Sequence, residues 1–158
     1  MAVLALNTTQ KDGVTRKRPF DTNAKLRFAY FALPAVVEAG DAGTTIELCD
    51  LPPGAVRLLP WMCRISTSAF GASRVLDIGH RAFQKADPFM NTATTEAESA
   101  AEFVNDLNVS SAVVNTAWST VQKYDLYSKS GVTLFATVAG GTIPIGATLS
   151  GLVAYLYE

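Results

Sequence analysis

Short apolar runs alternate with turn-favouring residues through most of this chain of 158 residues. A clear case is the β-branched and apolar run at residues 45–49, which stops at Asp-Leu-Pro-Pro-Gly, residues 50–54. The two prolines cannot donate ladder hydrogen bonds, and Gly54 is free to adopt a positive φ. The pattern predicts a strand that ends at a sharp corner.

Two further runs continue this unit. We interpret residues 55–67 as one longer strand, with Pro60 at a bulge or an edge position because proline lacks the N–H that a central ladder needs. Residues 70–73, Phe-Gly-Ala-Ser, predict the next turn. Residues 75–79 predict a short strand whose alternate side chains face opposite sides.

Strand patterns also lie on both sides of this unit. Residues 25–31 begin with alternating polar and apolar positions, with Leu26, Phe28 and Tyr30 on one face, and predict the first strand of the body. Residues 128–131, Ser-Lys-Ser-Gly, predict a hairpin turn. The remaining predicted strands cover residues 112–114, 117–121, 124–127, 132–138 and 152–157.

One segment carries a helical signal instead. Thr95 and Glu98 have the spacing of a capping box, and small or apolar residues recur at helical intervals from Ala97 to Val104. The sequence therefore predicts one short helix over residues 96–105, after a long surface loop. The acidic residues of its first turns suit the helix dipole, which favours a solvated helix start over a metal site.

These elements predict a single domain with an all-β fold. We expect an antiparallel β-sandwich of jelly-roll-like topology with one short helix, whose body covers residues 25–158. Residues 1–24 show neither the strand period nor the helix period, and we interpret them as an extended N-terminal arm.

Composition favours an assembled protein. Hydrophobic residues make up 49% of the chain and charged residues 17%, below the ~25% that is usual in soluble domains. An obligate homo-oligomer, dimer or trimer, fits this surface better than a free monomer. No apolar run has the length of a membrane span and no leader pattern begins the chain, so we expect a protein made and used in a cytosol.

Charge is distributed unevenly, although the net charge is only −1. Residues 1–30 hold six basic and two acidic residues, and the remainder holds seven basic and twelve acidic ones. Within the arm, Arg16, Lys17 and Arg18 offer charge and Phe20 offers an aromatic anchor for a protein partner. A solvated tail is an equal alternative, and nucleic-acid binding is a weaker one because the rest of the chain is acidic.

The cysteines and tryptophans favour structural roles. Cys49 and Cys63 fall on runs that could pair as neighbouring strands, but in a reducing compartment we expect buried thiols rather than a disulfide. Trp61 and Trp118 each lie in an apolar run, which favours core positions over a ligand-stacking platform.

Reactive constellations are missing from the sequence. His80 is the sole histidine, so a multi-histidine metal site is excluded, and we expect it to make an ordinary hydrogen bond at a strand end. Glu47 and Asp77 could lie on neighbouring strands, but no motif places a substrate beside them. We expect a protein that is not an enzyme and uses no cofactor.

Four motifs together resemble the small structural proteins of tailed-bacteriophage heads, in particular capsid decoration or cement proteins. The resemblance covers about residues 40–80 and 125–157. The motifs are Gly-Thr-Thr-Ile-Glu-Leu at 43–48, Leu-Pro-Pro-Gly-Ala at 51–55, Gly-Ala-Ser-x-Val-Leu-Asp-Ile-Gly at 71–79 and Gly-Gly-Thr-Ile-Pro-x-Gly-Ala-Thr at 140–148.

The resemblance implies a virion protein, made in the bacterial host cytoplasm, that binds the outer surface of a capsid. It would strengthen the shell by bridging subunits of the major capsid protein, without small-molecule substrate, metal, membrane or catalytic residues. Three alternatives stay open. They are a phage tail or baseplate component, a carbohydrate-binding β-sandwich module, which needs a row of exposed aromatic side chains, and a hydrolase centred on His80.

Overall fold

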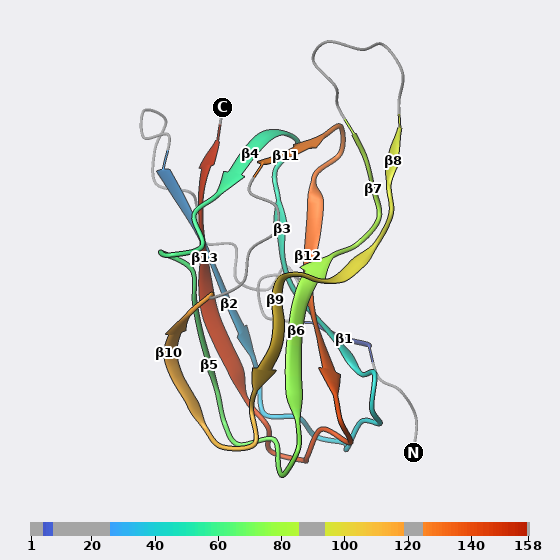
Figure 1. The fold of residues 1–158 in the computed structure, drawn as a ribbon, viewed down its shortest axis with the longest axis vertical. Helices are drawn as coiled ribbons and strands as arrows, with labels where there is room; N and C mark the ends of the chain where they lie inside the picture. The colour runs from blue at the N-terminus through green and yellow to red at the C-terminus, as the bar shows by residue number, and fades with distance from the viewer. Residues whose placement is uncertain (1–4, 8–25, 86–93, 119–124, 158) are drawn as a thin grey trace.

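The computed structural model describes residues 5–7, 26–85, 94–118 and 125–157 of the chain. All regular elements in these residues are strands, and they form two facing sheets and a short two-stranded ribbon (Figure 1). Sheet A contains, in spatial order, β1 (Ala5–Asn7), β3 (Thr45–Leu51), β12 (Val132–Ala139), β6 (Val75–His80) and β9 (Ser99–Asn108).

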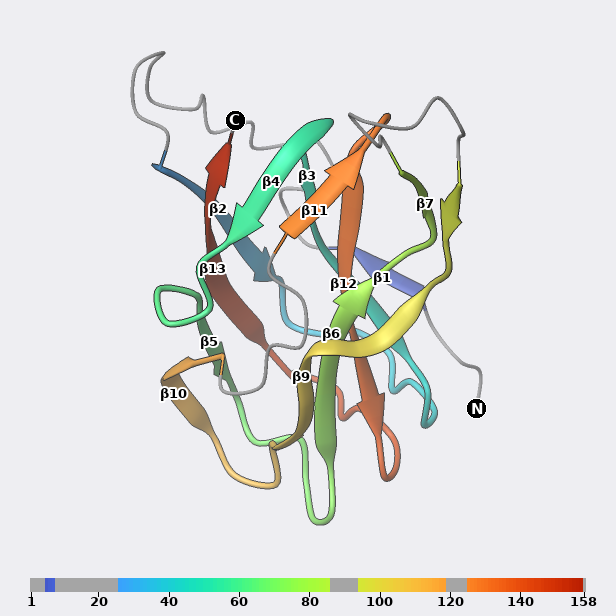
Figure 2. The ribbon, with the colours of Figure 1, turned by 45° about the horizontal axis from the view of Figure 1, so that its top comes forward.

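Sheet B has a less regular arrangement, because its central strand has different partners along its length. In spatial order sheet B contains β10 (Val113–Ala117), β5 (Arg64–Thr67), β13 (Leu149–Tyr157), β4 (Gly54–Leu58) and β11 (Asp125–Ser128), while β2 (Leu26–Leu33) pairs with β13 on its other side. The ribbon of β7 (Phe83–Gln84) and β8 (Thr95–Glu96) projects from one end of the sandwich (Figure 2).

Eight strands follow the path of one long hairpin rolled into a sandwich. The first pairs with the last, the second with the seventh, the third with the sixth and the fourth with the fifth: β2 with β13, β3 with β12, β5 with β10, and β6 with β9. Lateral pairing of β13 with β5 and of β12 with β6 then joins these pairs into two sheets. This connectivity is a jelly roll, which confirms the predicted fold class.

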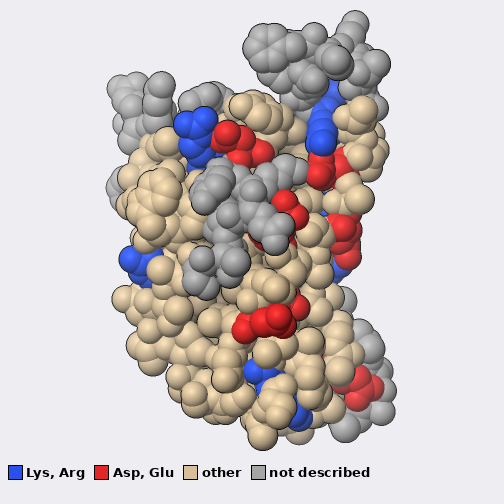
Figure 3. Space-filling view, in the orientation of Figure 1, with Lys and Arg blue, Asp and Glu red and all other residues tan. Residues whose placement is uncertain are grey.

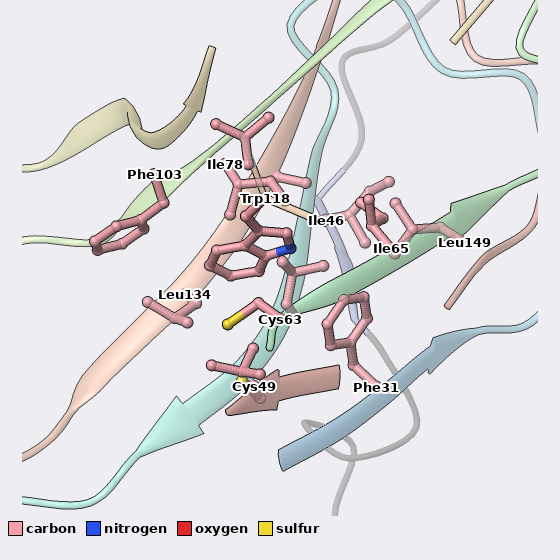
Figure 4. Packing of buried hydrophobic residues seen from close by; sticks show 14 of the residues in the cluster. Phe31, Ile46, Cys49, Cys63, Ile65, Ile78, Phe103, Trp118, Leu134 and Leu149 are labelled. Carbon is pink, nitrogen blue, oxygen red and sulfur yellow. The ribbon is translucent and has the colours of Figure 1, made fainter. Parts of the chain in front are cut away.

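The core lies between the two sheets (Figure 4). Trp118 is buried as predicted, and its ring stacks on Phe103 with 6.1 Å between ring centroids. Cys49 and Cys63 are both buried free thiols, as expected, but they are not on neighbouring strands. Cys49 belongs to β3 of sheet A, whereas Cys63 immediately precedes β5 of sheet B.

The predicted helix at residues 96–105 is wrong, because this segment is extended and runs from the last residue of β8 through most of β9. The alanines of the helical pattern would bury little apolar area. The strand instead buries the adjacent Phe103 and Val104, helped by irregular register against β6. The supposed helix-start acids form ion pairs, Glu98 with Arg81 and Glu96 with Lys85. Tertiary pairing thus overrides local helix propensity.

The turn predicted at residues 128–131 is present, but it does not close a hairpin. It connects β11 of sheet B to β12 of sheet A, and these two strands pair with β4 and with β3 and β6, respectively. A short turn between apolar runs therefore identifies a reversal of the chain but does not identify which strands pair.

Part of the predicted arm forms a strand. The backbone of Ala5–Asn7, β1, pairs in parallel with Thr45–Glu47 at the edge of sheet A. This is the only parallel pairing among the described strands, and it lies outside the rolled hairpin.

Strand β9 crosses close over β6 at Gly79. A Cβ atom at position 79 would lie 1.8 Å from the carbonyl oxygen of Ser99 and 2.7 Å from the carbonyl carbon of Ala100, both backbone atoms of the crossing strand. Only glycine allows the two backbones to approach this closely.

We therefore expect Gly79→Ala to lower the free energy of unfolding by about 1–3 kcal/mol or more, because backbone atoms cannot move aside as a side chain can. Urea denaturation followed by tryptophan fluorescence measures this loss. Ala82→Ser, at an exposed position just after β6, is the control and should stay within about 0.5 kcal/mol of the native protein. Equal stability of Gly79→Ala and the native protein would contradict the crossing geometry.

Candidate interaction surface

His80 is a core residue. Its ring is buried and packs edge-on against Phe83 and beside Phe103, with centroids 5.2 Å and 5.9 Å away. Nδ1 lies 3.0 Å from the carbonyl oxygen of Arg81, and since a carbonyl can only accept, this nitrogen carries the proton. The expectation of an ordinary hydrogen bond at a strand end is confirmed.

The two carboxylates considered as a catalytic pair are apart. Glu47 on β3 and Asp77 on β6 are separated by β12, which pairs with both strands, so they are not on neighbouring strands. Glu47 lies 3.6 Å from the Arg81 guanidinium, and Asp77 accepts a hydrogen bond of 2.7 Å from the backbone N–H of Asp106. Within the described residues, no group of three or more potential ligand side chains could hold a metal ion.

On the outer face of sheet A, polar side chains cover an aromatic ring. Phe135 points away from the core but is buried, because the guanidinium of Arg81 lies over its ring, 4.1 Å from the centroid. Arg81 also binds Glu98 at 3.2 Å and donates to Thr45 Oγ1 at 3.2 Å. The aromatic ring on this face is therefore already covered by the chain itself.

The outer face of sheet B differs, because it exposes aromatic rings. On β2 the residues Ala29, Phe31 and Leu33 point into the core, while Phe28 and Tyr30 point outward and are 43% and 47% exposed. The sequence correctly places Leu26, Phe28 and Tyr30 on one face, but this face lies on the outside of the sandwich.

The loop between β4 and β5 adds a third exposed aromatic ring. Residues 55–67 are not one long strand, since β4 ends at Leu58, β5 begins at Arg64, and both pair with the same side of β13. The intervening residues form a compact loop that stands out on the side of sheet B away from sheet A (Figures 1 and 2). Trp61 in this loop is 62% exposed, so the prediction of a core position for it is wrong.

Hydrogen bonds tie this loop to itself. Met62 and Cys63 donate their backbone N–H groups to the carbonyl of Leu59, at 2.9 and 3.1 Å. Arg64 Nη1 donates to the carbonyls of Trp61 and Cys63, at 2.5 and 2.8 Å. Pro60, which belongs to this loop, is buried. These bonds hold the loop together around an exposed indole, and we call it the Trp61 loop (residues 59–63).

Cys63 accepts a backbone hydrogen bond from β13 at the position where its neighbouring strands, β4 and β5, are interrupted. The backbone of Ala154 on β13 lies opposite the break, and its carbonyl accepts from the Leu59 N–H at 2.9 Å. Its N–H donates to the Cys63 sulfur at 3.3 Å. Burial raises the pKa of the Cys63 thiol from 9.0 to about 11, an effect opposed by this backbone hydrogen bond and by Arg64. The thiol is a buried acceptor for a backbone donor.

Charged residues are sparse on the face of the molecule seen in Figure 3. Figure 3 shows mostly uncharged surface, with small and separate groups of basic and acidic residues. On sheet B the guanidinium of Arg57 on β4 binds the carboxylate of Asp125 on β11, with 2.7 Å between Nε and Oδ1. Near the exposed rings, Arg57 is thus paired with a carboxylate and Arg64 is bonded to backbone carbonyls.

The residues predicted to bind a partner, Arg16, Lys17, Arg18 and Phe20, lie outside the described residues, so their role stays a prediction. Sequence reasoning missed the surface formed by Phe28, Tyr30 and the Trp61 loop, which we call the aromatic face of sheet B. Pro60 was a usable signal, since a proline inside a strand pattern also favours a loop. Within the described residues, no helix is long and apolar enough to cross a membrane.

Comparisons with known proteins support the fold. No protein-family model and no curated protein matches this sequence. Among solved structures, a chain from the capsid of Ralstonia phage GP4 is similar, with 17% identity, 98% of each chain covered and a TM-score of 0.59. The chain therefore shares its fold with that capsid chain.

A chain from the structure of infectious bursal disease virus, Gx strain, also overlaps. It has 15% identity and a TM-score of 0.42, with 85% of this chain and 33% of that chain covered. An overlap of this quality does not define a common fold.

We expect Cys63→Ala to destabilise the protein by about 1–3 kcal/mol, because the buried N–H of Ala154 loses its acceptor. Cys63→Ser is the matched control and should lose less, since a hydroxyl oxygen can also accept. Thermal unfolding gives the stabilities, and hydrogen exchange at the Ala154 amide gives the local effect. Unchanged exchange at this amide in Cys63→Ala would contradict the assigned role.

Stability should fall at alkaline pH. The folded-state pKa of Cys63, about 11, lies above its ordinary value of 9.0, so the unfolded state ionises first. The contribution is fully present below pH 9.0 and is lost as the pH rises to about 11, amounting to about 1–3 kcal/mol. Urea denaturation at stepped pH should show a steeper decline for the native protein than for Cys63→Ser. Parallel declines would mean that this thiol does not contribute.

Proposed function

We propose that this chain is a non-enzymatic structural protein of a virus particle. The observation that carries the proposal is the match, over 98% of both chains, to a chain described as part of a phage capsid. Jelly rolls serve as capsid domains and as lectins, so the fold is compatible with both functions and does not decide between them. His80, Glu47 and Asp77 have structural contacts, which supports a role that depends on surfaces rather than on reactive groups.

In more detail, we propose a decoration protein on the outer surface of a bacteriophage capsid, made in the host cytoplasm. It would bridge subunits of the major capsid protein, and it would bind there as a homo-oligomer. A compact sandwich with little charge and an N-terminal arm suits this role, because many weak contacts repeated over a shell give high avidity. A tail or baseplate component would use the same features, and separate assays of purified heads and tails would distinguish the two locations.

One observation favours a carbohydrate-binding module as a second candidate. The aromatic face of sheet B exposes Phe28, Tyr30 and Trp61, and such a module requires a row of exposed rings. Sugar recognition also needs convergent polar groups. Here Arg64 is engaged by the carbonyls of its own loop and Arg57 by Asp125, which makes a protein partner the better fit.

Removal of residues 1–24 should leave a folded body, because the eight strands of the rolled hairpin all lie beyond residue 25. We expect the truncated protein to bind capsids at least about tenfold more weakly, since an arm adds a tethered second contact. Co-sedimentation with capsids that lack this protein measures the difference.

Two substituted full-length proteins serve as controls for the truncation. The triple variant with Arg16, Lys17 and Arg18 changed to Gln tests the basic cluster, and Lys11→Gln is the matched single-charge control. Full occupancy of capsids by the truncated protein would refute the proposed role of the arm, whereas failure of the full-length protein to bind heads would refute the decoration role itself.

A further inference from the structure

We propose that the aromatic face of sheet B is where two copies of this chain associate, face to face, about a two-fold axis parallel to β13. The proposal goes beyond the assignment to a virus particle and does not depend on it. It rests on the strand register of sheet B, on the exposed rings and on the pairing of the charges around them.

The strand register places Phe28 and Tyr30 on one side of β13 and the Trp61 loop on the other side, at the same position along the strand. On one side, Phe28 and Tyr30 of β2 pair with Ala154 and Leu152. On the other side, β4 pairs with β13 down to Tyr155, and β5 pairs with β13 from Leu152 onward. The Trp61 loop, which joins these two strands, therefore lies beside residues 153 and 154 of β13. The flat aromatic pair and the projecting loop thus flank the same short stretch of β13.

This arrangement is self-complementary for one particular symmetry. A two-fold axis that runs parallel to β13, just outside sheet B, places the β2 side of one copy opposite the β5 side of the other. Each residue keeps its position along the direction of β13. It brings the Trp61 loop of each copy over Phe28 and Tyr30 of the other, so that the same aromatic contact forms twice. An isologous interface needs such self-complementarity, and aligned packing of two sheets face to face is a common arrangement.

The charges on this face also fit a second copy. Arg64 pairs with Leu152 and therefore lies at the height of Tyr30, so the same axis brings its guanidinium towards Tyr30 of the other copy. Arginine over an aromatic ring is a favourable contact. Arg57 is neutralised by Asp125 within each copy, so this arginine brings no unpaired charge into the interface, while Arg64 is held by the carbonyls of Trp61 and Cys63.

The exposed rings supply part of the area that a stable pair needs. Aromatic side chains bury roughly 150–250 Å² each, so the exposed parts of Phe28, Tyr30 and Trp61, at 43%, 47% and 62%, come to about 300 Å² per copy. A standard interface takes about 800 Å² from each partner, and aromatic anchors at its centre commonly dominate the binding energy. Leu26, Leu152 and Leu156 on the same face, each partly buried, can supply further area.

The first experiment measures the mass of the purified full-length protein over a range of concentrations, by analytical ultracentrifugation. We expect a dimer whose dissociation constant rises roughly 30-fold or more in Trp61→Ala, the size of effect that a central anchor shows. Phe28→Ala should weaken the dimer similarly. Ile145→Ala is the matched control, because Ile145 is exposed on a turn outside sheet B, and this variant should associate like the native protein.

Circular dichroism of each variant checks that the fold is kept, as expected for substitutions of exposed side chains. A monomer at all concentrations, or a dimer that neither Trp61→Ala nor Phe28→Ala weakens, would overturn the proposal. So would a monomer that binds glycans through Trp61 in a glycan array. A native protein that dimerises but fails to bind heads would leave this inference standing and would count only against the decoration role.

The second experiment tests the axis. Single variants Phe28→Cys and Trp61→Cys are mixed and treated with a short bismaleimide, while the native Cys49 and Cys63 are buried and should not react. The two-fold along β13 predicts cross-linked pairs in the mixture and few in Phe28→Cys alone, because the two copies of Phe28 then lie on opposite sides of the axis. Efficient cross-linking of Phe28→Cys to itself, with none in the mixture, would overturn the proposed symmetry.

Discussion

The pairing of β13 along both of its edges is the constraint on which the rest of the structure depends. One edge is paired with β2 from Leu149 to Leu156, and the other is shared between β5 and β4. The last strand of the chain thereby closes the rolled hairpin against the first strand of the body and holds sheet B together. The two partners on the shared edge meet opposite Ala154, whose backbone groups bond to Leu59 and Cys63 across the break.

This break connects the fold to the proposed role. A continuous strand opposite β13 would have satisfied the ladder without a loop, and Trp61 would then have had no projecting support. The interrupted strand keeps both backbone groups of Ala154 paired and still holds an indole out in solvent. Among the described residues, the outer face of sheet A exposes no such aromatic ring, since Arg81 covers the outward-facing Phe135. The two outer faces of one sandwich therefore differ in what they can bind.

Much of the fold could be predicted from local patterns. Turn chemistry at residues 50–54 and strand periodicity in residues 75–79 give the correct elements, because both signals act over a few residues. The all-β class and the jelly-roll-like topology follow from the number and spacing of the predicted strands and turns. The helix prediction for residues 96–105 fails because the alanines match a helical spacing, whereas the burial of Phe103 depends on pairing with β6, which is distant in the sequence.

The interaction surface was harder to predict, since it depends on which side of a sheet faces the core. Alternation in β2 identifies two faces, but both carry large apolar residues, Phe28 and Tyr30 on one and Phe31 and Leu33 on the other. Phe31 and Leu33 are buried only because sheet A packs against their side of sheet B. Trp61 likewise lies in a strand pattern that the structure interrupts, because Pro60 fits either a bulge or a loop.

In the proposed dimer, the aromatic face of sheet B becomes covered when the copies associate. Fluorine NMR of protein labelled with fluorotryptophan observes this directly, because the two tryptophans give separate signals, and Trp61→Phe assigns them. The account predicts that the Trp61 signal senses solvent in dilute protein and shifts to a buried environment as copies associate, while the Trp118 signal stays unchanged. A Trp61 signal that remains equally sensitive to solvent at every concentration and on assembled particles would contradict it.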